Sequence, residues 1–486
     1  MSEYEIPSDG LGNKDSENDL RKDSIGIWHV MAQGLMSNAP MSTFAVVFGA
    51  VAVYSLGASP IAFLLGALVV WLWVNTPFQF SKKLYSAAGI QYFTHTAIGS
   101  RAGFMAGTSY FTYYLAIISS NILAYAIVIQ YVLSNFGIAL PYWTFVPLSI
   151  LILIPGFVIN YLGIKTSLNY GIVTVVLELV VITVMSILII FAVGPENTLS
   201  VYNPSLGSGG VIGFAIGMLT ASYTMSGTTS TVYMGYESKA PQRTIKKGLV
   251  YATLLIVFVF VLFSYALTVG WGLSDIASVA TAPAPGIQIV AKYFGPIPEI
   301  IISLMALNSF FGLSVASIII CSRLSLTFSR QGLFPKSLGN IHKKYKVPHR
   351  SITFVFVLGI IWAEIVAVII GSFNAYIWLI LEATIAEFIG HIIGDIALPA
   401  YYFKKSDFSI LKHIILPIGS IIIILFGIFY TFYPISQPTI YAPLFMIVVL
   451  ILSAFLHWRT TKKKGTKEIN YGIESLAIET GSLGRE

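Results

Sequence analysis

The stretch "MAQGLMSNAPMSTFAVVFGAV", residues 31–51, decides the fold of this chain. Both of its ends are apolar, and its length suits one membrane-spanning helix, but the polar and helix-breaking residues 37–40 interrupt its middle. Non-helical backbone is tolerated at membrane depth only where it is buried in protein or lines a cavity, because unpaired N–H and C=O groups are costly in lipid. The interruption therefore predicts a site inside the membrane.

The rest of the chain has the composition of a membrane protein. Of its 486 residues 56% are hydrophobic and 10% are charged, and the mean hydropathy is +0.81. Apolar runs of about 20 residues, enough to cross about 30 Å of hydrocarbon, predict an all-α protein with twelve membrane spans. We place the spans at 28–56, 59–80, 103–133, 143–162, 168–194, 210–235, 248–272, 298–325, 351–370, 374–402, 411–432 and 438–458.

The basic residues predict the orientation of these spans. An even number of spans puts both termini on one side, and Lys and Arg are retained in cytoplasmic loops. With a cytoplasmic N-terminus, all of the 28 Lys and Arg residues except Lys292 fall inside, which explains the net charge of +7 without a nucleic-acid partner. We therefore expect a multi-pass protein of the cell (cytoplasmic) membrane with both termini in the cytoplasm.

The two ends of the chain and its loops contain no sequence motif of an enzyme. Residues 1–25 lack an apolar signal region and predict a disordered cytoplasmic tail, and 459–486 form a basic cytoplasmic tail. The single Cys321 permits no intramolecular disulfide and no thiolate metal site. Zinc-binding HEXXH and phosphate-binding Walker patterns are absent, so no metal and no cofactor other than a coupling ion is expected.

A second interrupted span predicts an internal repeat. "GMLTASYTMSGTTSTVYMG", residues 217–235, has a small polar run in mid-membrane and follows the first interruption by five spans. This spacing predicts two five-span repeats, 26–200 and 201–405, each opening with a discontinuous helix, the second inverted because five is odd. Spans eleven and twelve, 406–458, are then extra. An ordinary kink explains one such run as well as a ligand site does, but two runs in corresponding positions favour the site.

The ends of half-helices suit a particular kind of ligand. N-termini present N–H groups to an anion, whereas C-termini present carbonyl groups to a cation. A zwitterion with an α-carboxylate and an α-ammonium group uses both. The paired interruptions therefore predict an amino acid site.

Three loop stretches carry a resemblance to a known family. They are "YSAAGIQYFTHTAIGSRAGFMAG" (85–107), "YESKAPQRTIKKGL" (236–249) and "SRLSLTFSRQGLFPKSLGNIHKKYKVPHRSI" (322–352). Together they closely resemble the cytoplasmic-side signatures of the amino acid/polyamine/organocation (APC) permease superfamily, and the similarity runs from about residue 26 to 455. The resemblance implies a secondary transporter with a five-plus-five inverted repeat, which holds its substrate between spans one, three, six and eight and works by alternating access.

The same resemblance implies which residues bind substrate. The backbone N–H groups that would meet the carboxylate belong to Ser37, Asn38 and Ala39. The residues that would meet the amino group and side chain are Met225, Ser226, Gly227, Thr228 and Thr229. Tyr113 and Asn121 resemble the wall of the pocket, although ordinary helix packing explains the tyrosine equally well. No acid follows Gly227, where many relatives have one, which favours a small neutral or hydroxylated amino acid over a polyamine or arginine.

Ionisable residues inside the spans are candidates for ion coupling, because they are costly in a membrane. Glu178 lies in span five, where some proton-coupled relatives have a lysine, and it can bind sodium or carry a proton. Ser314 and Ser317 fall near the hydroxyl groups that ligate sodium in sodium-coupled relatives.

Span ten holds a second group of ionisable residues. Glu387, His391 and Asp395 are spaced four apart and form one helical stripe that can pass a proton, whereas Glu382 is rotated by about 140° from Glu387. A simple pairing of His391 with Glu387, with Asp395 reaching the surface, is the alternative.

We therefore predict a proton-coupled amino acid symporter whose partners are its substrate and the lipid bilayer, as a monomer or weak homodimer. An exchanger or a sodium-coupled symporter is the nearest alternative. A membrane ligand sensor with a transporter-like pocket is the alternative from another class, but its usual large cytoplasmic domain has no counterpart in tails of this length.

Overall fold

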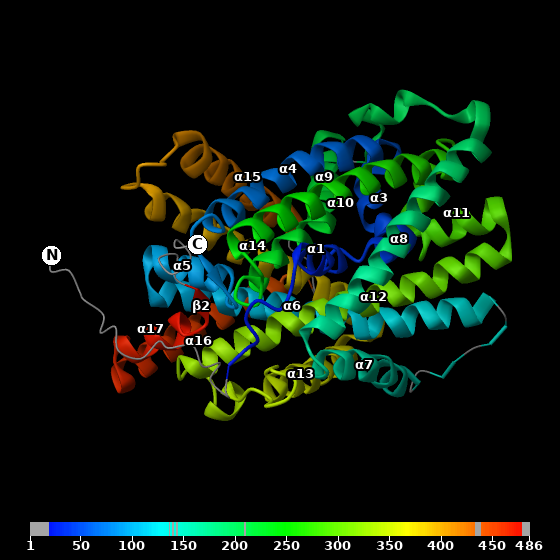
Figure 1. Cartoon of the computed structure of the whole chain (residues 1–486). Coiled ribbons are helices and arrows are strands. Elements are labelled where there is room, and N and C mark those ends of the chain that lie inside the picture. Colours follow the sequence, from blue (N-terminus) through cyan, green and yellow to red (C-terminus); the bar gives the residue numbers. More distant parts are fainter. Residues whose placement is uncertain are drawn as a thin grey trace.

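The computed structural model describes residues 19–135, 137–138, 140–141, 144–208, 210–432 and 439–478, and these residues are almost entirely helical (Figure 1). The α-helices are α1 Ile27–Met36, α2 Pro40–Ser42, α3 Phe48–Ser55, α4 Ser59–Phe80, α5 Ile90–Ile98, α6 Ser100–Asn135, α7 Phe145–Tyr161, α8 Ile164–Val193, α9 Gly210–Met225, α10 Pro241–Trp271, α11 Pro285–Phe294, α12 Pro296–Arg330, α13 His349–Ile370, α14 Ser372–Tyr402, α15 Leu416–Phe432, α16 Tyr441–Lys464 and α17 Thr466–Glu474.

Short 3₁₀- and π-helices and one small sheet complete the fold. The π-helices are η1 Thr43–Val47 and η10 Leu411–Ile415, and the strands are β1 Tyr85–Ser86 and β2 Ala477–Ile478. The 3₁₀-helices are η2 Leu56–Ala58, η4 Gly194–Glu196, η5 Leu199–Tyr202, η6 Pro204–Leu206, η7 Ser226–Met234, η8 Ile276–Thr281 and η9 Lys336–Gly339.

Nine segments of the described chain are long and apolar enough to span a membrane. They are Ile27–Phe80, Ser100–Gln130, Ile164–Glu196, Pro241–Trp271, Pro296–Arg330, His349–Ile370, Ser372–Tyr402, Leu411–Tyr430 and Tyr441–Lys464. The protein is thus an all-helical, multi-pass membrane protein. Large apolar side chains on the outside of α8, such as Val173 (69% exposed) and Phe191 (77%), are suited to lipid.

The predicted spans and the observed helices agree closely in the middle of the chain. The first candidate segment, 54 residues long, contains both predicted spans 28–56 and 59–80, and α4 has the predicted bounds. Two further predicted spans correspond to α7 and α9. These helices have 17 and 16 residues and are too short to be counted among the nine candidate segments. The sequence analysis missed α5, α11 and α17, because helices of nine or ten residues with mixed composition do not stand out as apolar runs.

The two interruptions take different forms. In span one, α1 stops at Met36 and Ala39 adopts a left-handed conformation with φ 43°, before Pro40 opens α2. In span six we expected a break in the helix at 226–229. The chain does not unwind there and instead forms the tighter 3₁₀-helix η7. A 3₁₀-helix keeps i to i+3 hydrogen bonds, and such mid-helix stretches are typical of functional hinges.

Both ends of the described chain pack against the same end of the bundle. Residues 1–18 of the predicted disordered tail lie outside the described residues, but 19–25 are in place: Leu20 is buried, and Ile25 pairs with Ser238. This corrects the expectation of disorder up to residue 25. At the C-terminus β2 pairs antiparallel with β1, and Leu476 packs in one cluster with Leu20. In Figure 1, α17 and β2 lie beside α5, at the opposite end of the molecule from α11.

Two of the loop stretches that carry the family resemblance meet at this end. The Arg323 guanidinium on α12 donates to the Glu237 carboxylate, with Nε to Oε2 at 2.8 Å, and both side chains are buried. The Glu237 carbonyl in turn accepts from the backbone N–H groups of Ser24 and Ile25. A buried ion pair with one partner removed is strongly destabilised, so this contact fixes the start of α1 relative to α12.

Candidate functional site

The interruption of span one is built so that its backbone groups find partners. The N–H groups of Ser37, Asn38 and Ala39 donate to carbonyl groups of α1, at 3.0 to 3.2 Å. The Asn38 carbonyl accepts from the Thr43 hydroxyl at 3.0 Å, and the Ala39 carbonyl accepts from the Ser42 hydroxyl at the same distance. In this conformation the three N–H groups that the resemblance offered to a substrate carboxylate are therefore bonded within the chain.

A carboxylate caps the second half of the broken helix. Glu178 on α8 accepts from the Met41 N–H at 3.2 Å and from the Ser309 hydroxyl at 2.7 Å, both at Oε2, while its Oε1 accepts from Asn308 Nδ2 at 3.3 Å. The carboxylate is 2% exposed. It lies where the partial positive charge of a helix N-terminus favours an anion. Three donors in this arrangement suit an ionised carboxylate, which only accepts hydrogen bonds.

A cavity of about 90 Å³ lies beside the interruption. It is enclosed by the residues of span one after α1, by α6, by the last turn of α9 and by α12 and α14. Its lining residues are Ser37, Asn38, Ala39, Ser42, Thr43, Val47, Tyr113, Ile117, Ser120, Asn121, Tyr223, Thr224, Phe310, Leu313, Tyr376 and Ile380. Pockets for drug-sized ligands measure roughly 300–1,000 Å³, so this cavity suits a small solute.

The predicted residues of spans one and three meet in this cavity. Ser37, Asn38, Ala39, Tyr113 and Asn121 all line it. The Asn121 amide Nδ2 also donates to the Ser314 hydroxyl on α12 at 3.1 Å, which joins spans three and eight across the cavity wall. Sequence reasoning missed Ser120, Tyr223 and Tyr376, for which the only signal was a polar side chain within an apolar span.

The predicted residues of span six pack behind the cavity instead. Among the described residues that line it, span six contributes Tyr223 and Thr224 and none of the run 225–229. Thr228 accepts from the Thr253 hydroxyl on α10 at 2.9 Å. Gly227 lies against the Ser37 carbonyl group, so the two interruptions touch each other directly.

The ion-coupling candidates separate into two places. Ser314 contacts Asn121, and the Ser317 hydroxyl donates to the Leu313 carbonyl, so the structure does not join either serine to Glu178. The α12 residues that contact Glu178 are Asn308 and Ser309. The sequence analysis did not select this polar pair, although it stands out in the apolar context "MALNSFFG".

The stripe on α14 is buried and bonded to three neighbouring elements. The Ser226 hydroxyl of η7 lies 2.9 Å from Glu387 Oε1, and His391 Nε2 lies 3.6 Å from the same oxygen. Asp395 is 1% exposed, so it does not reach the surface, and it accepts from the Thr76 hydroxyl on α4 and the Ser420 hydroxyl on α15. Glu382 faces away from this stripe, as its rotation predicts.

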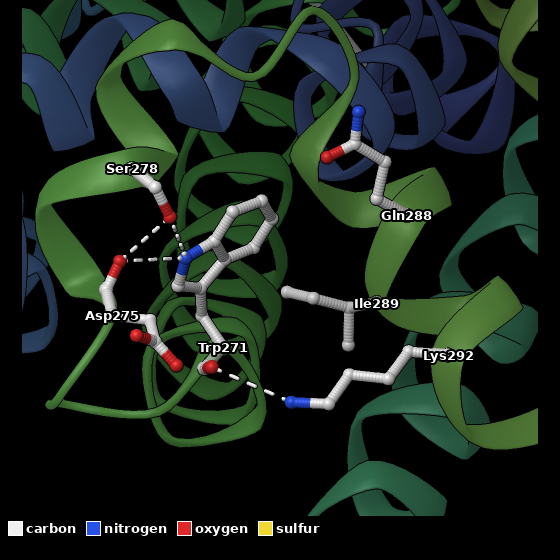
Figure 2. A pocket seen from close by; sticks show the side chains of 6 residues that line it. All are labelled: Trp271, Asp275, Ser278, Gln288, Ile289 and Lys292. Carbon is white, nitrogen blue, oxygen red and sulfur yellow. Dashed lines mark hydrogen bonds between the residues drawn. The ribbon is translucent and has the colours of Figure 1, made fainter.

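A wider hollow lies at the far end of the bundle from the termini (Figure 2). It measures about 300 Å³ and is lined by Trp271, Asp275, Ser278, Gln288, Ile289 and Lys292. The Trp271 indole N–H points to the Asp275 carbonyl and the Ser278 hydroxyl, at 3.1 and 3.0 Å, so the ring is held in place. The charged side chains here are exposed, and none of the predicted site residues lines this hollow.

Fold and cavity together define a class of protein. The chain is a multi-pass helical membrane protein with a small cavity, lined by polar and apolar side chains, at a broken helix, and solute carriers have this architecture. Comparison with known proteins gives the family: the amino acid permease family matches residues 29–469, and the chain belongs to this family of the APC superfamily. Members of this family are transporters and not enzymes.

Individual relatives differ in the solutes that their names record. The chain is 24% identical over 342 residues to the branched-chain amino acid permease BcaP of Bacillus subtilis (strain 168), covering 65% of this chain and 71% of the relative. It is 25% identical over 343 residues to the low-affinity putrescine importer PlaP of Escherichia coli (strain K12), covering 69% and 73%. It is 23% identical over 324 residues to the methylthioribose transporter of Bacillus subtilis (strain 168), covering 63% and 67%.

The contact between the interruptions leads to a prediction for Gly227→Ala. A Cβ atom at residue 227 would overlap the Ser37 carbonyl group, which is backbone and cannot rotate away. We expect the variant to lose about 1–3 kcal/mol of stability, as overpacked cores do, and to melt at a lower temperature. Gly419→Ala on α15 is the matched control, because nothing lies within 4 Å of its Cβ position. Equal melting temperatures for both variants in detergent would show that the interruptions do not touch.

Proposed function

We propose that this protein is a secondary active transporter that moves a small neutral amino acid across the cell membrane by alternating access. The observation that supports this most directly is the small cavity beside the interrupted helix of span one. No charged side chain is among the described residues that line it. Its hydroxyl, amide and aromatic groups suit a solute with polar ends and little net charge.

The lining of the cavity supports a zwitterion over a polyamine. The Asn38 Oδ1 atom is buried and has no hydrogen-bond partner among the described residues, so it is available to an ammonium group. The hydroxyl groups of Ser42, Thr43 and Ser120 line the cavity, and each donates to a backbone carbonyl group in this conformation, so a substrate carboxylate would have to replace those acceptors. A diamine carries two positive charges, and closing it into a cavity without an anionic partner would cost far more. We therefore assign substrate contact to Ser37, Asn38, Ala39, Tyr113 and Asn121 and place Met225 to Thr229 behind them.

We further propose twelve spans arranged as two inverted repeats, 26–200 and 201–405, followed by 406–458. The nine candidate segments support this number, since the first of them holds two predicted spans and α7 and α9 supply two more. The repeat is supported by two interruptions that stand five spans apart and touch at Gly227. The basic loops support cytoplasmic termini.

The proposed orientation makes a prediction that labelling can test. In a Cys321→Ser background, a cysteine at Tyr471 on α17 should not react with a membrane-impermeant reagent added to intact cells. Tyr471 is 74% exposed, so burial within the protein would not explain its protection. Asp275→Cys at the opposite end of the bundle should react readily. The reverse pattern would overturn the orientation.

For the coupling ion we propose a proton, carried by the acidic residues of span ten. Glu387 Oε2 and His391 Nε2 are buried and have no hydrogen-bond partner among the described residues, which supports these two atoms as the places where a proton is held. Glu178, our first candidate from the sequence, receives three donors and is better suited to holding the broken helix. Sodium remains the competing ion, with Ser314 and Ser317 as its candidate ligands, and exchange without a driving ion is the second alternative.

Uptake of neutral amino acids into vesicles tests this function. We expect a labelled substrate to accumulate when the outside is made acidic, with or without sodium, and to exchange by counterflow in the absence of any gradient. Glu178→Gln should lower the melting temperature, because an amide cannot accept all three hydrogen bonds, whereas Glu387→Gln should abolish accumulation and leave counterflow.

Three outcomes would contradict the proposal. Uptake that requires sodium and ignores the pH gradient would favour the sodium reading. Counterflow without accumulation in either gradient would identify an exchanger. Binding of amino acids, seen as a rise in melting temperature, without any counterflow would identify a sensor.

A further inference from the structure

Ser226 lies between two acceptors at the junction of α9 and η7. Its hydroxyl is 2.9 Å from the Tyr223 carbonyl oxygen, one turn back on its own span, and 2.9 Å from Glu387 Oε1 on α14. The residue is 1% exposed, so water does not compete for it. A hydroxyl group has a single proton to donate, and the state of Glu387 therefore decides which of the two acceptors receives it.

The two states of Glu387 make different sets of bonds. An ionised carboxylate can only accept, so Ser226 must donate to Glu387, and the Tyr223 carbonyl loses the hydroxyl. A protonated carboxyl group can donate its own proton to Ser226 Oγ, and Ser226 then donates to the Tyr223 carbonyl. A hydrogen bond to a charged group is stronger than one between neutral groups, and the difference is enough to shift the balance between two conformations several-fold.

The surroundings of Glu387 allow it to change state. Its second oxygen, Oε2, has no partner among the described residues, and the nearest basic group is His391 on the same helix. The titratable groups near it are His391 on α14, Tyr110, Tyr113 and Tyr114 on α6, Tyr223 on α9 and Tyr233 on η7, and Asp395 lies one turn beyond His391. None of these is a fixed positive charge. His391, whose Nε2 lies 3.6 Å from Glu387 Oε1, is the base that can take a proton from it.

The Tyr223 carbonyl lies next to the substrate cavity. Tyr223 and Thr224 both line the cavity, and Ser226, which contacts Glu387, follows Thr224 after one intervening residue. A change in the bonding of Tyr223 therefore acts on the cavity wall from span six.

We infer that Ser226 is a positioning residue that transmits the protonation state of Glu387 to the cavity wall at Tyr223, and that it is not a substrate contact. The inference rests on the proposed transport function, and it replaces the substrate role that the resemblance gave to Ser226. In this inference, the coupling between proton binding at Glu387 and substrate binding in the cavity depends on one hydroxyl group, which lies between spans six and ten.

Ser226→Ala tests the inference in reconstituted vesicles. We expect counterflow with a half-saturating concentration within about two-fold of wild type, but a loss of at least ten-fold in accumulation driven by a pH gradient. The half-saturating concentration in wild type should change between acidic and alkaline pH, and in Ser226→Ala it should not. Ser226→Thr restores the hydroxyl group and should restore the pH dependence.

Ser230→Ala is the matched control on the same 3₁₀-helix. Its hydroxyl donates to the Gln33 carbonyl at 3.3 Å and has no contact with Glu387, so this variant should couple as wild type does. Accumulation by Ser226→Ala equal to that of Ser230→Ala would overturn the inference. So would a large rise of the half-saturating concentration of Ser226→Ala at every pH, because that result would make Ser226 a substrate contact.

A second measurement needs neither substrate nor transport. Hydrogen exchange of the backbone amides in 223–230, corrected for the intrinsic effect of pH, should differ between acidic and alkaline pH in wild type. It should be the same at both values in Ser226→Ala and in Glu387→Gln. Exchange that responds equally to pH in wild type and Ser226→Ala would contradict the inference even if the transport function proved wrong.

Discussion

The fold depends on the need to pair the backbone groups of an interrupted helix in the middle of a membrane. Span one meets this need locally. Carbonyl groups of α1 accept hydrogen bonds from the N–H groups of 37–39. The Thr43 hydroxyl donates to the Asn38 carbonyl, and the Ser42 hydroxyl donates to the Ala39 carbonyl. One further donor, the Met41 N–H, is met by Glu178 from a distant helix. Each of these partners is polar, and together they bring hydroxyl and amide groups to the wall of a small cavity inside the helix bundle.

The same constraint connects span one to spans five, eight, six and ten. Glu178 links the interruption to Ser309 on α12, and Gly227 brings the interruption of span six against the Ser37 carbonyl. From there Ser226 reaches Glu387. The hydrogen bonds of Ser226 thus connect Tyr223, in the wall of the cavity, to the buried carboxyl group of Glu387. Under the proposed function, this connection lets one site couple the movement of a solute to that of a proton.

The sequence correctly predicted an all-helical, multi-pass membrane protein, because the length of apolar runs is a local property of the chain. It also brought Ser37, Asn38, Ala39, Tyr113 and Asn121 to one place, and the structure places all five on the cavity. It could not predict that η7 keeps a 3₁₀ form, or that 225–229 pack behind the cavity, because both follow from the close approach of Gly227 to span one. The sequence also could not predict the hydrogen-bond partners of Glu178 or the packing of residues 19–25 and 476. These contacts join segments that are far apart in the chain.

The central claim is that the cavity at the interruption of span one is where the solute binds. Ser42 lines it, so in a Cys321→Ser background we would introduce Ser42→Cys and measure the rate of its modification by a small thiol reagent. If the solute binds in this cavity, a saturating concentration of the transported amino acid should slow this modification at least several-fold, while Ser278→Cys in the hollow at the far end should react at an unchanged rate. Equal rates at Ser42→Cys with and without the amino acid would show that the solute binds elsewhere.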